Sequence, residues 1–79
     1  ARAPEAVPPL REVVRLSPGL AVGHGLLAAA LGRTGDYREG RKVLREAPLP
    51  RPGLPSAVEI ARGELARSGD LEAIRRLGL

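Results

Sequence analysis

The chain has 79 residues, with 13 Lys and Arg against 9 Asp and Glu and a net charge of +4, so it can form at most one small domain with a marginal core. It contains no Cys, Met, Trp or Phe, which excludes disulfides, thiolate metal sites and thiol catalysis and leaves an aliphatic core. Basic and acidic residues are interspersed, which indicates a salt-bridged surface, and no apolar run is long enough for a transmembrane helix.

The first part of the chain predicts an irregular stretch and then a helix. The irregular stretch is expected to reach Pro8 and Pro9, because proline suits the first turn of a helix. An apolar stripe at helical spacing follows, made of Leu10, Val13, Val14 and Leu16. The segment Ser17-Pro18-Gly19 is expected to end this helix and turn the chain.

The middle of the chain predicts two helices joined by a tight turn. Residues 21–33 form the first, with an apolar face of Val22, Leu26, Leu27, Ala30 and Leu31. Gly35 and Asp36 make the turn, and Asp36 is well placed to cap the next helix, residues 37–46. The inward-facing residues of that helix are expected to be Tyr37, Gly40, Val43, Leu44 and Ala47.

A proline-rich connector and two further helices complete an all-α chain. Prolines at 48, 50, 52 and 55 predict a stiff, extended connector. Ser56 can cap a fourth helix that runs to Arg67, with apolar side chains at Val58, Ile60, Ala61 and Leu65. After a second Gly-Asp turn at 69–70, residues 71–77 predict a last short helix.

Identical residues recur at a spacing of 34 positions. Pro18-Gly19-Leu20 returns as Pro52-Gly53-Leu54, and Gly35-Asp36 returns as Gly69-Asp70. Arg33 returns as Arg67. A fixed period of this length is typical of stacked helical repeats, which present surfaces to partners and seldom catalyse reactions.

These 34-residue helix–turn–helix units, with Gly-Asp-aromatic at the inner turn and Pro at the outer turn, resemble tetratricopeptide repeats (TPR). The resemblance runs from about residue 6 to residue 77. It rests mainly on Leu27, Ala28, Leu31, Gly35, Asp36, Tyr37, Gly40, Leu44 and Ala47. It implies a short right-handed α-solenoid of about two and a quarter units. The units are a half unit over 1–20, a full unit over 21–54 and a degenerate final unit over 55–79.

The last unit departs from the family pattern. Ile74 stands where a small residue is expected and Gly78 where a bulky one is expected, so either the unit is degenerate or its second helix is shifted by one residue onto Ala73. The small residues Gly40 and Ala28 are expected to let paired helices approach closely. Because roughly three repeats are needed for independent stability, we expect further repeats, another domain or self-association to stabilise the chain.

The composition and the N-terminal sequence bear on the source and the location of the chain. The absence of Asn, Gln, Cys and Met fits a thermophile, and a GC-rich genome would give a similar bias. The chain starts at Ala1 without a signal-peptide pattern, so we expect a processed chain or a piece of a longer one, in the cytoplasm.

The residues that imitate catalytic or cofactor motifs have structural explanations. Gly23-His24-Gly25 resembles part of a dinucleotide fingerprint, but the apolar run before it is too short for a strand. His24 has no ligand partner at metal spacing and is expected to fill the space between helices. Four hydroxyl residues flank turns and lack a local base: Ser17, Thr34, Ser56 and Ser68. The sequence therefore predicts no enzyme activity, no cofactor and no metal.

The basic residues of the third and last helices are expected to be solvated. They are Arg41, Lys42, Arg45, Arg75 and Arg76. Glu39 and Glu46 interrupt the stripe, and the aromatic platforms of single-strand binders are missing. An RNA-binding helical repeat is therefore the least favoured alternative.

The resemblance implies that the first helix of each unit lines a concave, peptide-binding face. On this chain the implied residues are Val22, Gly25, Ala29, Gly32, Arg33, Ser56, Glu59, Gly63, Ala66 and Arg67. Most are small, so a partner helix could approach closely. Arg33 and Arg67 could pair with carboxylates of an acidic partner, or with Glu59, Glu64 or neighbours within the chain. We expect a scaffold that binds a protein or peptide, the alternative being an oligomerisation or accessory segment of a larger enzyme or assembly factor.

Overall fold

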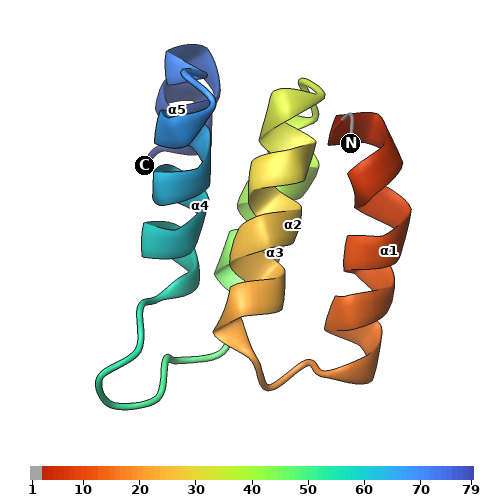
Figure 1. Cartoon of the computed structure of the whole chain (residues 1–79), viewed down its shortest axis with the longest axis vertical. Helices are drawn as coiled ribbons and strands as arrows, with labels where there is room; N and C mark the ends of the chain where they lie inside the picture. Colours follow the sequence, from red (N-terminus) through yellow and green to blue (C-terminus); the bar gives the residue numbers. More distant parts are fainter. Residues whose placement is uncertain (1–2) are drawn as a thin grey trace.

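The computed structural model describes residues 3–79, which form five α-helices and no strand (Figure 1). The helices are α1 (Ala3–Leu16), α2 (Ala21–Arg33), α3 (Tyr37–Glu46), α4 (Ala57–Arg67) and α5 (Leu71–Leu77). The predicted all-α class and the predicted bounds of α2, α3, α4 and α5 are confirmed. Ala1 and Arg2, part of the predicted irregular stretch and of the predicted domain, lie outside the described residues.

Helix α1 begins earlier than the sequence predicted. It starts at Ala3 and holds Pro8 and Pro9 in its interior, so the expectation of an irregular stretch is wrong for residues 3–9. Each proline removes one backbone N–H from the helix, and both are exposed, so the carbonyls left without a donor can be hydrated. Val7 and Leu10 pack against the core, and this tertiary contact outweighs the local preference of the prolines.

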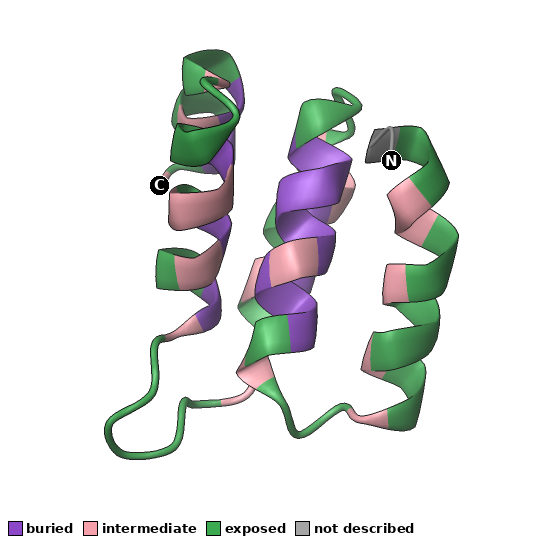
Figure 2. Cartoon of the chain, viewed as in Figure 1, coloured by how far each residue is buried: buried purple, intermediate pink, exposed green. Residues whose placement is uncertain are grey.

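The helices lie in two layers with α2 at the centre. In Figure 1, α1, α2 and α4 lie side by side, and α3 and α5 lie behind α2 and α4. Helix α2 contacts each of the other four helices. It is consequently buried along most of its length, as Figure 2 shows, and this suits its Ala- and Leu-rich sequence.

Small residues allow the helices to approach closely. A Cβ atom at Gly40 of α3 would lie 3.4 Å from the Ala28 carbonyl oxygen of α2 and 2.7 Å from Cδ2 of Leu77. The expected close approach at Gly40 and Ala28 is therefore confirmed. The buried core around this contact is aliphatic and consists of Leu27, Ala28, Ala29, Leu31, Val43, Ala61, Leu65, Ala73 and Leu77.

The two Gly-Asp turns share one geometry, 34 residues apart. Gly35 and Gly69 have φ values of +88° and +72°, the left-handed region in which glycine carries no steric cost. The N–H of Asp36 donates to the Leu31 carbonyl oxygen at 2.9 Å, and the N–H of Asp70 makes the equivalent bond at the same distance. This is the Schellman pattern that ends a helix, so the sequence period is also a repeat of backbone geometry.

The side chains of the same aspartates cap the helices that follow. Asp36 accepts a hydrogen bond from the Glu39 N–H at 3.4 Å, and Asp70 accepts one from the Ala73 N–H at 3.0 Å. Their predicted role as caps is confirmed, which accounts for both carboxylates without catalysis.

Helix α5 adopts the shifted arrangement of the two that the sequence left open. Ala73 and Leu77 are buried, whereas Ile74 is only partly buried. Gly78, at φ +76°, ends the helix and fills no core position. The shift brings Leu77 against Gly40 of α3, where the absence of a side chain leaves room for it.

Candidate protein-interaction groove

Three of the residues predicted to line the concave face are buried between helices. They are Gly25, Ala29 and Gly32. A Cβ atom at Gly25 would lie 2.7 Å from Cβ of Ile60 and 2.8 Å from the Ala57 carbonyl oxygen, and one at Gly32 would lie 2.8 Å from Leu77. The two glycines are contact points for α4 and α5, so the prediction is corrected for these three residues: they offer no surface to a partner.

The other seven predicted residues lie at least partly at the surface of α2 and α4. They are Val22, Arg33, Ser56, Glu59, Gly63, Ala66 and Arg67. Ser56 and Glu59 form a capping box in which each residue's backbone N–H donates to the other's side chain at 3.1 Å. The Ser56 backbone N–H, followed by its hydroxyl, holds the pKa of Glu59 below its ordinary value.

The two recurring arginines have different surroundings. Arg67 pairs with Glu64 one turn earlier on α4, an interaction within the chain that the sequence allowed as an alternative. Among residues 3–79, Arg33 forms no ion pair and its side chain donates no hydrogen bond. Of the two, Arg33 is the side chain left free for a partner.

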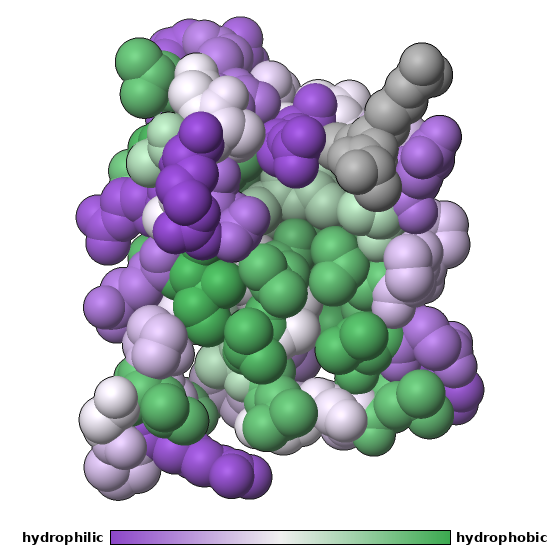
Figure 3. All heavy atoms as spheres, in the orientation of Figure 1, coloured by the Kyte–Doolittle hydropathy of each residue, from purple (hydrophilic) through white to green (hydrophobic). Residues whose placement is uncertain are grey.

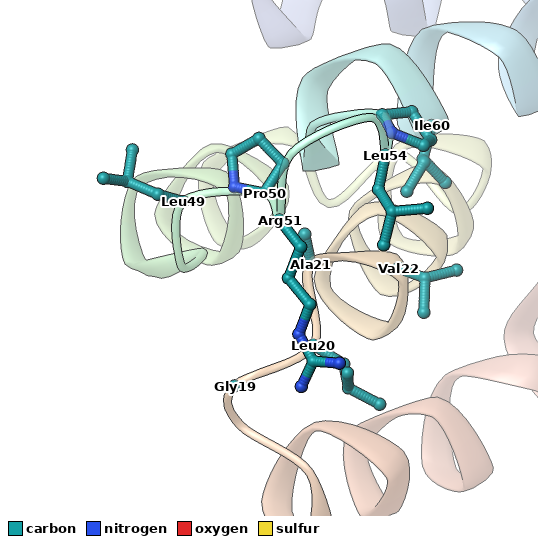
Figure 4. Close-up of a pocket in the computed structure, with 10 residues that line it drawn as sticks. Gly19, Leu20, Ala21, Val22, Leu49, Pro50, Arg51, Leu54 and Ile60 are labelled. Carbon is teal, nitrogen blue, oxygen red and sulfur yellow. The ribbon is translucent and has the colours of Figure 1, made fainter.

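A hollow of about 340 Å³ opens between the start of α2, the connector and α4, as Figure 4 shows. We call it the apolar groove. Its lining consists of Gly19, Leu20, Ala21, Val22, Leu49, Pro50, Arg51, Leu54, Pro55 and Ile60. Every lining residue except Arg51 is uncharged. Val22 is its only member among the predicted site residues, so sequence reasoning missed most of the groove.

The connector forms one wall of the groove because it folds into a short turn. The N–H of Leu54 donates to the Arg51 carbonyl oxygen at 3.0 Å, and Gly53 takes a φ of +82° within that turn. In Figure 4, Leu54 points from the connector toward Val22 of α2, while Leu49 lies at the edge and points outward. The only sequence signal for this wall was the presence of leucines between the prolines. Because the prolines stiffen the connector, it cannot bend to bury these leucines in the core.

The groove exposes several large apolar side chains. Four large apolar side chains of its lining are exposed: Leu20 (39%), Val22 (46%), Leu49 (91%) and Leu54 (59%). Figure 3 shows that apolar side chains gather on this face, over α1, α2 and α4, with polar ones around them. A contiguous apolar patch with a polar rim is typical of a protein-interaction site.

A second, basic surface covers α3. Arg38, Arg41, Lys42 and Arg45 are exposed, and their spacing puts them on neighbouring turns. Glu39, which interrupts the stripe in sequence, pairs with Arg11 of α1 at 3.5 Å. The Arg41 side chain donates to the Arg76 carbonyl oxygen at 3.0 Å, which ties part of this surface to α5.

The other residues considered as catalytic or cofactor-binding candidates have structural roles. His24 is buried, and its Nδ1 lies 3.3 Å from the Leu20 carbonyl oxygen, so it fills space between helices as expected. The fingerprint-like segment around Gly23 is part of α2 and forms no phosphate loop. Between residues 3 and 79, no His, Cys, Asp and Glu side chains gather as metal ligands, and no helix has the length and apolar character needed to cross a membrane.

No family model, curated protein or solved structure matches the chain. Its function therefore has to follow from its own surfaces. Of the apolar groove and the basic surface of α3, the groove says more about function. A basic helix face is stable in water by itself, whereas exposed leucines lose the free energy that burial would give, about 25 cal/mol per Å².

Proposed function

We propose that the chain is a non-enzymatic protein-interaction module that holds an apolar segment of a partner in the apolar groove. The observation that carries the proposal is the exposure of Leu20, Val22 and Leu54 around one hollow. A groove lined in this way binds an apolar partner segment by burying aliphatic side chains of both proteins, and this binding requires no reacting group or cofactor.

We also propose that the helices form the short right-handed TPR-type α-solenoid that the sequence resembles. The repeated Schellman turns and the placing of α2 and α4 in one layer, with α3 and α5 in the other, support this arrangement for residues 21–79 (Figure 1). Helix α1, from the half unit, lies beside α2 in the layer of α2 and α4. The groove lies on the layer of the first helices, the side on which the resemblance implies peptide binding.

Substitution of the groove tests the proposed function. Val22→Glu and Leu54→Glu each place a charge in the hollow, and we expect each to weaken binding to an array of synthetic apolar peptides at least about tenfold. Leu71→Glu is the matched control, because Leu71 is 73% exposed and is not part of the groove lining. Equal binding by all three variants and the unmodified chain would rule out the groove as the binding site.

A second candidate function is self-association. Val58 and Leu71 are exposed on α4 and α5, where a further helical unit could stack. A smaller hollow of about 270 Å³ lies between α3, α4 and the end of α5, with Leu44, Val58 and Leu77 in its lining. Sedimentation equilibrium over a range of concentrations separates the two functions. Under this alternative Leu71→Glu prevents association, whereas under the leading proposal the unmodified chain stays monomeric.

A further inference from the structure

On the α2–α4 face, the acidic side chains have partners within the chain, whereas two of the basic side chains have none among residues 3–79. Its acidic side chains are engaged within the chain: Glu59 accepts from the Ser56 N–H, and Glu64 pairs with Arg67. Arg33 and Arg51 have no ion pair and donate no side-chain hydrogen bond to any residue from 3 to 79. The charge of Arg62 on α4 acts on that of Glu59, and Glu64 and Arg67 offset each other, so Arg33 and Arg51 leave this face with a net positive charge.

These two cations lie near opposite ends of α2. The surface of α2 between them is apolar at Val22 and Leu26, whereas Ala29 and Gly32, nearer Arg33, are buried between helices. Arg51 is the one charged residue of the groove lining, and in Figure 4 its side chain extends from the connector toward the start of α2. Arg33 is at the last turn of α2. It lies about three turns beyond Val22 on the same helix face, or about 16 Å along the axis. Leu26, one turn after Val22, is partly exposed between them.

The lining also limits the conformation of the occupant. No strand is present among residues 3–79, so a partner cannot add a strand to a sheet edge. Grooves that bind polyproline segments are lined by aromatic side chains, and Tyr37, the only aromatic residue, does not line this one. An amphipathic helix that seats aliphatic side chains in the groove and passes over α2 remains as the recognition mode.

We propose that the occupant is an amphipathic helix of a partner protein, with aliphatic side chains facing Val22 and Leu54 and carboxylates placed to meet Arg33 and Arg51. The inference rests on the proposed function and adds the charge of the partner. Arginine pairs with carboxylate through parallel hydrogen bonds, so an acidic helix satisfies both cations as it covers the groove. A basic helix, or a second copy of this chain with its net charge of +4, would meet repulsion there.

Two synthetic helical peptides test the inference. Both carry Leu at helical spacing, and they differ only in two flanking positions, which are Glu in one and Lys in the other. We expect fluorescence anisotropy to show that the Glu peptide binds the unmodified chain at least about tenfold more tightly than the Lys peptide. The double variant Arg33→Glu/Arg51→Glu is expected to reverse this preference.

The control double variant is Arg38→Glu/Arg45→Glu, which changes the net charge equally but lies on α3, in the other layer. It should keep the preference for the Glu peptide, and circular dichroism checks that both variants fold. Equal affinities for the two peptides, no binding of the Glu peptide, or the same loss in both double variants would overturn the acidic-helix inference. A dimer that Val22→Glu dissociates would assign the groove to a second copy and overturn it as well. The proposed function fails separately, when Val22→Glu and Leu54→Glu leave all peptide binding unchanged.

Discussion

Gly25 of α2 and Gly63 of α4 have opposite structural roles. Gly25 lies in the contact between α2 and α4, and an added Cβ would lie 2.8 Å from the Ala57 backbone carbonyl oxygen, which cannot move without shifting α4. Gly63 lies inside α4 with only the far end of Arg67 nearby, at 3.7 Å. The sequence predicted one role for both residues, as small positions on a groove, because it carries no information on which helix crosses at which point.

The pair predicts opposite effects of the same substitution. Gly63→Ala should stabilise the chain by about 0.5–1 kcal/mol, because alanine is the better helix former and its methyl group meets only the far end of Arg67, in ordinary van der Waals contact. Gly25→Ala should destabilise it by about 1–3 kcal/mol, because overpacking at the α2–α4 contact outweighs that gain. The free energy of unfolding in urea measures both. Equal stability of the two variants would contradict the contact assigned to Gly25.

The helices themselves follow closely from local sequence signals. Asp36, Ser56 and Asp70 each cap the helix that follows, and the glycines at 35 and 69 end the helix before, so α2 to α5 could be bounded without tertiary information. The start of α1 could not be predicted in this way, because the interior position of Pro8 and Pro9 depends on core packing. The groove could not be predicted from local signals either, since its wall depends on how the connector folds back toward α2.

The capping box of α4 predicts a dependence on pH. Because hydrogen bonds from Ser56 lower the pKa of Glu59, the ionised carboxylate contributes stability above its ordinary pKa of 4.5, and this contribution is lost as the pH falls through the lower, folded-state pKa. Glu59→Gln should therefore be less stable than the unmodified chain near neutral pH, and the difference should shrink in acid. Thermal unfolding followed by circular dichroism across this range measures the difference.

Glu46→Gln is the matched control for that measurement. Its carboxylate, also exposed on a helix, takes part in no hydrogen bond or ion pair among residues 3–79. A difference between Glu59→Gln and the unmodified chain that stays constant from neutral to acid pH would show that the capping box does not depend on ionisation of Glu59.

At the scale of the whole molecule, two layers of helices separate two kinds of surface. The layer of α1, α2 and α4 carries the apolar groove, and α3 in the other layer carries the basic surface. The separation means that a partner can be assigned to one surface by mapping alone. The basic residues of α3 account for part of the net charge of +4, and they lie apart from the groove (Figure 1).

The most direct test of the apolar groove as the binding site is a two-dimensional ¹⁵N–¹H NMR titration of the chain with the Glu peptide. We expect amide shifts to concentrate at Leu20, Val22, Arg51, Leu54 and Ile60, with a further shift at Arg33. Shifts concentrated on α3 at Arg38, Arg41, Lys42 and Arg45, with the groove amides unmoved, would contradict it.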